Sequence, residues 1–279
     1  MMLSPHMHPT APFPSLPARL EAAHAAHGLR LRRFGVAYED LMVDCGRPVG
    51  PHLITALLAC CTERPAGQAL EPQFFWDLGV GKRIECLLIL ASLEGTKELS
   101  IPLRCPQPSC GQPIEIDLTL EEILAVGQET GDDTLSVQFG EVCLVVRRPT
   151  GADQLAWLQH IVQDERAAVQ TILRTLIVEG PEMEHTQTCI GQIEATLDRH
   201  DPLVQFSLSV VCPYCRELAP HEVDLAAFAV QKLRAAQGLL IEEVHRLAAH
   251  YHWTEAEILA IPAWRRAHYL ALVEREEMR

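Results

Sequence analysis

The chain has 279 residues, a length that is sufficient to bury a hydrophobic core without disulfides. Apolar residues make up 48% and charged residues 22%, as in ordinary globular proteins. It carries 23 basic and 37 acidic side chains, a net charge of −14. Residues 231–279 contain seven basic and seven acidic side chains, so the whole acidic excess lies in residues 1–230. This charge argues against binding to nucleic acids or anionic membranes. No apolar run reaches the about 18 residues that cross a bilayer, and the N-terminus lacks the segments of a signal peptide, so we expect a cytoplasmic protein.

Three regions are predicted along the chain. Residues 1–28 are rich in Pro, His and Ala without periodicity, which is typical of a flexible arm. Residues 29–230 are predicted to form an α+β body, and residues 231–279 a helical segment. Within the body, apolar residues over 74–93 are spaced as in a mostly buried helix, although glycines weaken its first half.

Two stretches of the body, 97–118 and 203–225, share one layout. Each has an alternating strand, Cys-Pro, a second Cys, a short turn and a second strand ending in Asp-Leu. Between them, residues 134–149 predict a hairpin with Gly140 in its turn, followed by helices. We therefore predict an α+β fold. Its two repeats form one antiparallel zinc-ribbon-like sheet, with a helical insert between them and a C-terminal helical hairpin.

Four cysteines in these repeats have the spacing of metal ligands. Cys105 and Cys110 are separated by Pro-Gln-Pro-Ser, and Cys212 and Cys215 by Pro-Tyr. Each pair can direct two thiolates at one point, and four sulfurs complete a closed tetrahedral zinc site. The prolines favour the tight turns that such a site needs, although the first spacing is at the wide end of the usual range. The sequence therefore predicts a structural Zn²⁺.

Two alternatives compete with this prediction. Cys212-Pro-Tyr-Cys215 is also the active-site string of glutaredoxin-like thiol–disulfide oxidoreductases, in which the first thiol has a lowered pKa and reacts with alkylating agents. That motif should begin a long helix, whereas a strand is predicted after Cys215. A zinc-ribbon nucleic-acid adaptor should carry a basic stripe, which the charge distribution does not show.

The sequence contains no recognisable active site. His245, His250 and His252 diverge on a helix, and the phosphate-binding, dinucleotide-binding and nucleophile-elbow motifs are missing. We therefore expect a protein that is not an enzyme and takes no small-molecule substrate.

The C-terminal segment has clear helix boundaries. Thr254 and Glu257 have the spacing of a capping box, and Pro262 suits the start of a last helix. We expect Trp253 and Trp264 to pack the helical hairpin together, and the Arg-Arg pair that follows Trp264 to contact a partner.

This segment, LLIEEVHRLAAHYHWTEAEILAIPAWRRAHYLALVERE, resembles a helical part of small proteins from phage-tail-like contractile injection systems. Upstream, VVRRPTGADQLAWL and CPYCRELAPHEVDLAAFAV resemble the baseplate protein family of T-even-type contractile phages, which is linked to baseplate hub assembly. The likeness covers residues 70–279.

The resemblance implies a non-enzymatic component or assembly factor of a baseplate or hub. Such a protein would bind hub or spike proteins and could become part of the assembled particle. Its zinc ligands would be Cys105, Cys110, Cys212 and Cys215. Its partner-facing helical surface would present Tyr251, His252, Trp253, Trp264, Arg265, Arg266 and Tyr269.

Overall fold

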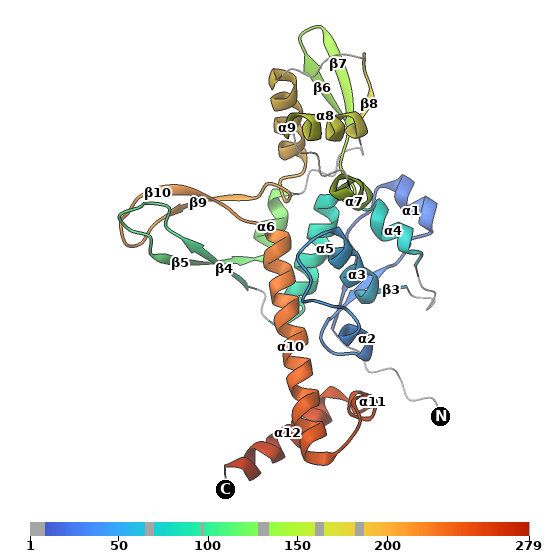
Figure 1. Cartoon of the computed structure of the whole chain (residues 1–279), viewed down its shortest axis with the longest axis vertical. Coiled ribbons are helices and arrows are strands. Elements are labelled where there is room, and N and C mark those ends of the chain that lie inside the picture. The colour runs from blue at the N-terminus through green and yellow to red at the C-terminus, as the bar shows by residue number, and fades with distance from the viewer. Residues whose placement is uncertain are drawn as a thin grey trace.

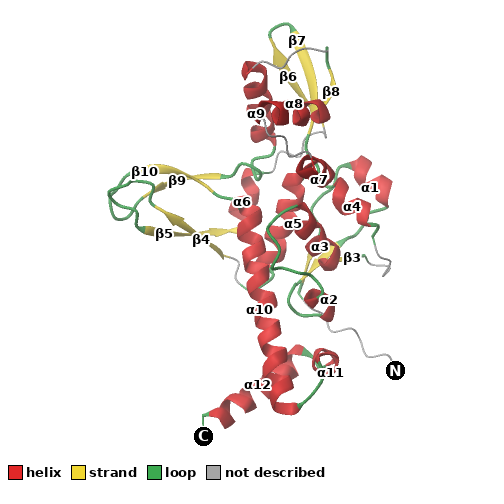
Figure 2. Ribbon diagram, viewed as in Figure 1, coloured by secondary structure: helices red, strands yellow, loops and turns green. Residues whose placement is uncertain are grey.

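The computed structural model describes residues 9–64, 70–95, 98–127, 134–159, 165–181 and 187–278, and it confirms a mixed α+β fold (Figures 1 and 2). Its principal core is formed mainly by α3 (Pro51–Cys61), α4 (Pro72–Asp77), α5 (Val80–Ser92) and the first turns of α10 (Leu225–Tyr251). Leu57, Leu87 and Leu90 are completely buried in this core. The other elements are arranged around it.

The N-terminal residues pack against this core. The elements are β1 (Thr10–Pro12), α1 (Ala18–His24), β2 (Arg30–Arg32), α2 (Tyr38–Leu41) and β3 (Thr62–Glu63). The three strands form one antiparallel sheet in the order β1-β2-β3, and Phe13 and Leu20 contact the core. The prediction of a flexible arm is therefore wrong for residues 9–28, because their apolar side chains pack against the principal core. Residues 1–8 lie outside the described part of the chain.

The predicted helix over 74–93 is divided into α4 and α5. Leu78 has an extended backbone, and Gly79 pairs with Thr150 in an isolated antiparallel bridge. The amide of Val80 donates to Pro149 O at 2.9 Å, and that of Gly151 to Leu78 O at 3.1 Å. These hydrogen bonds interrupt the helix and join it to the start of the insert.

The two cysteine repeats form separate hairpins. The first consists of β4 (Glu98–Arg104) and β5 (Pro113–Thr119), and the second of β9 (Ser207–Val211) and β10 (Leu218–Glu222). Each hairpin is a two-stranded sheet of its own, so the prediction of one shared sheet is wrong. The hairpins meet instead at their cysteine turns (Figure 1). Side chains such as Ile114 and Val210 pack beside the cysteines. The helix α6 (Leu120–Val126) follows the first hairpin and α10 follows the second.

The insert between the hairpins forms a lobe with its own core. Its elements are β6 (Thr134–Phe139), β7 (Val142–Arg147), α7 (Gly151–Gln159), α8 (Glu165–Leu176), β8 (Ile177–Glu179) and α9 (Gln187–His200). The predicted β6–β7 hairpin is confirmed, with Gly140 at φ +59° in its turn. The strand β8, which the sequence did not predict, adds to β7. Val146, Leu176 and Ile193 belong to this second core, whereas α7 packs against α3 and α4.

The C-terminal segment is helical, as predicted, but it does not begin at residue 231. The helix α10 crosses that boundary without a break and runs from the principal core to α11 (Glu255–Ala260) and α12 (Ala263–Glu277) (Figure 1). The predicted capping box at Thr254 is confirmed. Among the described residues, no helix combines the length and apolarity needed to cross a membrane.

Candidate metal centre

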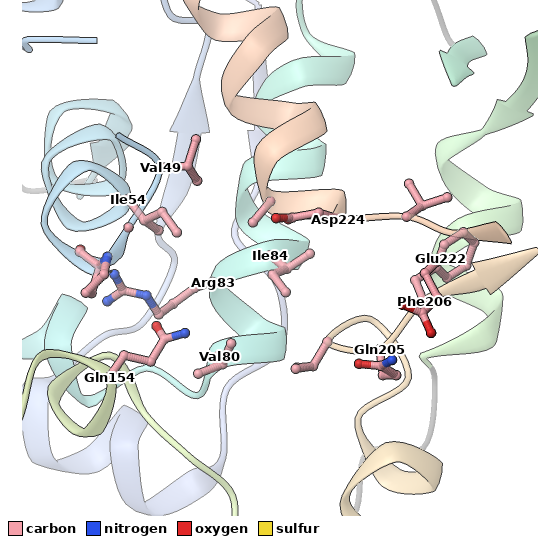
Figure 3. Close-up of a pocket in the computed structure, with 15 residues that line it drawn as sticks. Val49, Ile54, Val80, Arg83, Ile84, Gln154, Gln205, Phe206, Glu222 and Asp224 are labelled. Carbon is pink, nitrogen blue, oxygen red and sulfur yellow. The ribbon is translucent and has the colours of Figure 1, made fainter. Parts of the chain in front are cut away.

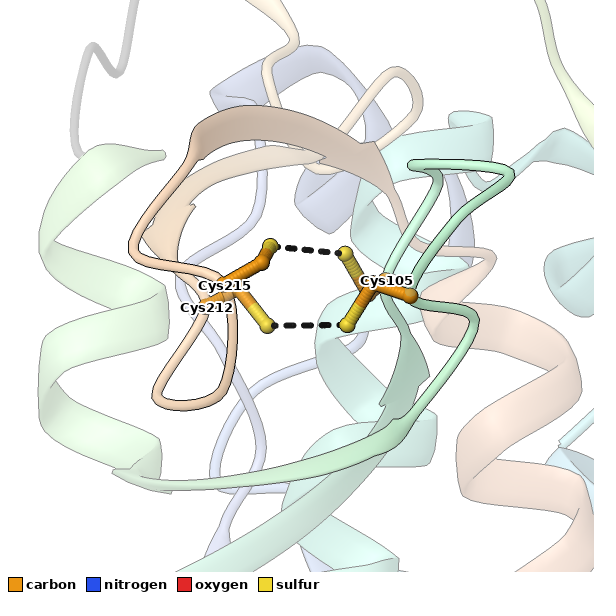
Figure 4. Close-up of side chains that lie close together, drawn as sticks. Cys105, Cys212 and Cys215 are labelled. Atoms are coloured by element: carbon orange, nitrogen blue, oxygen red, sulfur yellow. Dashed lines mark hydrogen bonds between the residues drawn. The ribbon is translucent and has the colours of Figure 1, made fainter.

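The cysteine turns of the two hairpins bring four sulfurs to one point (Figure 4). The Sγ atoms of Cys105 and Cys215 lie 3.7 Å apart, and those of Cys110 and Cys212 lie 3.8 Å apart. All four sulfurs lie within 4.8 Å of one another, and none is in a disulfide. The predicted ligands are therefore together and can hold a metal ion.

The two turns share a backbone design. In the first, the amide of Cys105 donates to Gln112 O at 2.9 Å, and the residue after the second cysteine, Gly111, has φ +56°. In the second, the amide of Cys212 donates to Glu217 O at 2.9 Å, and Arg216 has φ +65°. The left-handed residue in each turn reverses the chain immediately after the second thiol. A glycine adopts this conformation without a steric penalty, whereas Arg216 is held there by its turn.

Backbone amides point at the sulfurs. The amides of Cys215 and Tyr214 lower the pKa of the Cys212 thiol to about 7. The amide of Gln107 acts in the same direction on Cys105, but burial and the adjacent thiols raise the pKa of Cys105 to about 12. The amide of Glu217 likewise lowers the pKa of Cys215, but burial and Cys212 raise it overall. Four thiols this close cannot all ionise unless a cation neutralises them.

The spacing of the sulfurs fits a tetrahedral metal ion. A Zn–S bond of about 2.3 Å gives a sulfur–sulfur edge of about 3.8 Å in a regular tetrahedron. The distances of 3.7 and 3.8 Å between the hairpins agree with that edge. Cys105 and Cys212 are buried, Cys110 is half-buried and Cys215 is exposed. Four protein ligands would fill a tetrahedral ion, which is the pattern of a structural site rather than a catalytic one.

A second group of potential ligands already has hydrogen-bond partners within the chain. Asp40, Cys60 and Cys61 lie close together, but Arg32 occupies the carboxylate of Asp40 with hydrogen bonds of 2.7 and 3.2 Å. Burial lowers the pKa of Arg32, and the hydrogen bond and charge of Asp40 more than reverse that effect. The amides of Val36 and the next residue donate to the same carboxylate. Asp40 therefore has its counterion within the chain.

The predicted partner-binding residues divide into three groups. Tyr251, Trp253 and Tyr269 pack together, with the rings of Tyr251 and Trp253 stacked at 4.5 Å between centroids. The expectation that Trp253 packs the helical hairpin is confirmed. Trp264 is 66% exposed, so the same expectation for Trp264 is wrong. It lies at the start of α12, and its ring centroid is 6.1 Å from that of His268.

The other members lie at helix ends. His252 ends α10 in a left-handed conformation and is exposed. Arg265 is exposed, and its guanidinium lies 6.0 Å from the ring centroid of Tyr269. Arg266 is only 3% exposed and donates to Glu243 Oε1 at 2.6 Å and to Ile261 O at 2.8 Å. The prediction that both arginines face a partner is therefore wrong for Arg266, which joins α12 to α10.

A cavity that the sequence did not indicate lies between α3, α5 and the start of α10 (Figure 3). Its volume is about 540 Å³, and Val80, Ile84, Phe206 and Glu222 are among its lining residues. Arg83 also lines it but is itself 1% exposed.

Arg83 joins three helices at this cavity. Its guanidinium donates to Phe75 O at 2.6 Å, Pro51 O at 2.7 Å and Thr55 Oγ1 at 2.9 Å. Burial lowers the pKa of Arg83 to about 10, so the side chain stays charged at neutral pH. Because these acceptors belong to α3 and α4, Arg83 on α5 fixes the packing of the three helices. The only sequence signal for it is a charged residue at the start of an apolar helical run.

Comparisons of the chain with protein families, curated proteins and solved structures return no match.

Proposed function

We propose that Cys105, Cys110, Cys212 and Cys215 bind one Zn²⁺ ion and that this ion has a structural role. The observation that carries the proposal is the convergence of four sulfurs from two separate hairpins at the spacing of a zinc tetrahedron. Backbone amides directed at the sulfurs support it, because they stabilise thiolates in metal-binding turns.

The ion connects parts of the chain that are far apart in sequence. The paired cysteines are separated by 110 and 102 positions, and the insert lobe lies between them. The two hairpins share no backbone ladder, and only a small apolar cluster joins them beside the cysteines. A bound ion therefore closes a loop of about 100 residues, for which the loss of chain entropy in the unfolded state is large. Its role would be to hold the two hairpins together at their cysteine turns.

A direct test is the metal content of the full chain purified under reducing conditions without chelator. We expect about one Zn²⁺ per chain, and loss of that ion in Cys212→Ser. Cys143→Ser is the matched control, because Cys143 is exposed on β7 and outside the cluster.

The oxidoreductase alternative makes an opposite prediction in the same experiment. The lowered pKa of Cys212 is the observation that favours it. A metal-free protein in which Cys212 is alkylated rapidly and reduces a model disulfide would contradict the zinc proposal. Retained zinc with slow alkylation, made fast by a chelator, would contradict the alternative.

We further propose that the protein is a non-enzymatic component or assembly factor of a contractile-tail baseplate or hub. The resemblance of the C-terminal segment and of residues around Cys212 supports this proposal. The exposed side chains of Trp264 and Arg265 support a role in binding other proteins. The partners would be hub or spike proteins, met in the cytoplasm during assembly.

This second proposal is tested by co-expressing the chain with candidate hub, spike, tube and sheath proteins of a contractile tail from the same source. We expect one of the hub or spike proteins to co-purify with the wild type. Trp264→Ala should reduce its recovery, whereas Leu239→Ala, which removes an exposed apolar side chain from α10, should not. Recovery of none of these proteins would contradict the proposal.

A further inference from the structure

Three arginines are buried in the described part of the chain, and Arg83 differs from the other two in its partners. Arg32 and Arg266 each pair with a carboxylate, at 2.7 and 2.6 Å. Arg83 donates only to two backbone carbonyls and a hydroxyl, and its guanidinium lies 5.5 Å from the ring centroid of Trp76. A buried cation with neutral partners has lost its hydration without gaining an opposite charge.

The cavity beside Arg83 has room for the missing anion. Its volume of about 540 Å³ is within the range of small-molecule sites. Figure 3 shows Arg83 and Gln154 on one side of the cavity and Phe206 and Glu222 on the other. Arg83 Nε and Gln154 Oε1 are both buried without a hydrogen-bond partner. Because buried polar atoms are normally paired, this side of the cavity is incomplete.

Gln154 can complete a site for a carboxylate. Its side chain is half-buried, whereas Arg83 is fixed by three hydrogen bonds, so Gln154 is the one that can move. Turned by half a rotation, the amide of Gln154 presents its NH2 group in place of its oxygen. The Nε–H of Arg83 and this NH2 group would then both donate to one carboxylate, and a charged acceptor strengthens both hydrogen bonds.

The rest of the cavity favours one negative charge joined to an apolar body. The helix α3 begins at the cavity with Gly50 as its N-cap and no side-chain cap, so the positive end of its dipole favours an anion there. Val80, Ile84 and Phe206 provide apolar walls. The exposed carboxylate of Glu222, on the side away from Arg83, disfavours a second negative charge.

We propose that this cavity binds a small monocarboxylate with an apolar body, and that Arg83 and Gln154 hold its carboxylate. The ligand supplies the buried guanidinium with an opposite charge, and its apolar body lies against Val80, Ile84 and Phe206. The molecule is bound as a ligand and is not a substrate. None of the four clustered cysteines lines the cavity, so this site does not depend on the proposed metal centre.

The test is isothermal titration calorimetry of the full zinc-loaded chain with octanoate. We expect one octanoate per chain with a Kd of about 1 mM or lower. Octanol and octylamine have the same tail and should bind at least about ten-fold more weakly, because neither offers Arg83 a negatively charged acceptor. This ligand series needs no variant. Absence of octanoate binding, or equal binding of the three compounds, would overturn the proposal.

A variant locates the site within the chain. Gln154→Glu places a carboxylate of nearly the same shape beside Arg83, so octanoate should bind at least about ten-fold more weakly while the midpoint of thermal unfolding is kept or raised. Gln192→Glu is the matched control, since it makes the same change at an exposed position of α9 outside the cavity and should bind octanoate as the wild type does. Wild-type affinity in folded Gln154→Glu would contradict the proposal.

Discussion

The principal core and the pair of cysteine hairpins are held together by different interactions. Around α5, the core consists of completely buried leucines from several helices, and its cohesion comes from apolar area removed from water. The buried cluster between the hairpins contains only Ile114 besides cysteines, with a few half-buried side chains around it. The comparison teaches that one chain can combine a region held by extensive apolar burial with a region that has little apolar contact and a group of potential metal ligands.

Removal of the metal ion should produce the largest difference in stability between the hairpins and the principal core. Zinc binding at structural sites contributes on the order of 10 kcal/mol, so chelation should open the contact between the hairpins while the core stays folded. Hydrogen exchange is the measurement: amides of β4, β5, β9 and β10 should lose protection, and those of α5 should keep it. Equal loss in both regions would mean that they are one cooperative unit.

A substitution in the principal core should instead destabilise the core and leave metal binding by the hairpins unchanged. Leu87 is completely buried on α5, so Leu87→Ala should lower the free energy of unfolding by about 3 kcal/mol. Chemical denaturation measures this change, and zinc content should remain that of the wild type. Leu239→Ala removes the same atoms from a side chain that is 68% exposed and should change stability little. Similar losses in the two variants would contradict the burial argument.

Weakening the attachment of α12 to α10 should lower stability by an intermediate amount. Arg266→Ala removes the hydrogen bonds to Glu243 and Ile261 and leaves the Glu243 carboxylate without this partner, at a cost of about 2 kcal/mol. Exchange of α12 amides should accelerate, while the core and the hairpins keep their protection. The neighbouring Arg265→Ala is the control, because Arg265 is exposed and makes only a distant ring contact.

The smallest effect should be found at the base of the insert lobe. Burial raises the pKa of Asp153, but the hydrogen bonds from Arg147, two of them at 2.6 Å, and from Thr150 hold it below its ordinary value. A depressed pKa stabilises the fold above the ordinary value of 3.8. This contribution is lost as pH falls through the lower folded pKa.

Asp153→Asn should therefore cost about 1 kcal/mol at neutral pH and remove this part of the acid dependence. Thermal unfolding followed from pH 7 to pH 3 measures both effects. Asp198→Asn, at an exposed position on α9, should preserve the wild-type dependence. An unchanged acid limb in Asp153→Asn would show that the ion pair contributes nothing.

Much of the cysteine site could be predicted from the sequence, because ligand spacing and turn-forming prolines are local features. The way in which the hairpins meet could not. Alternation along a strand indicates which side chains share a face, but not whether two hairpins join through their edges or through their turns. The Asp-Leu pairs of the repeats illustrate the limit: Asp224 caps α10, whereas Asp117 lies inside β5 and Thr119 caps the helix that follows.

Other differences have a similar origin. Strand β8 has only three residues and follows α8 directly, so no turn residue marks its start. Arg265 and Arg266 cannot be distinguished by their residue type, yet Arg266 donates to Glu243 whereas Arg265 is exposed to solvent. Such choices depend on tertiary neighbours, which periodicity does not describe. The exposure of Trp264 likewise depends on which residues of α10 and α11 lie opposite the start of α12.

The helix α10 gives the molecule a mechanical property. It is separated from β10 by two residues, is capped by Asp224, and continues for 27 residues towards the C-terminal helices. At 1.5 Å per residue it is a rod of about 40 Å, so a tilt of about 5° at its first turn would move its far end by about 3.5 Å. The first turns of this rod are packed in the principal core, so α10 carries the orientation of that core, rather than the position of the second cysteine hairpin alone, to the exposed C-terminal surface.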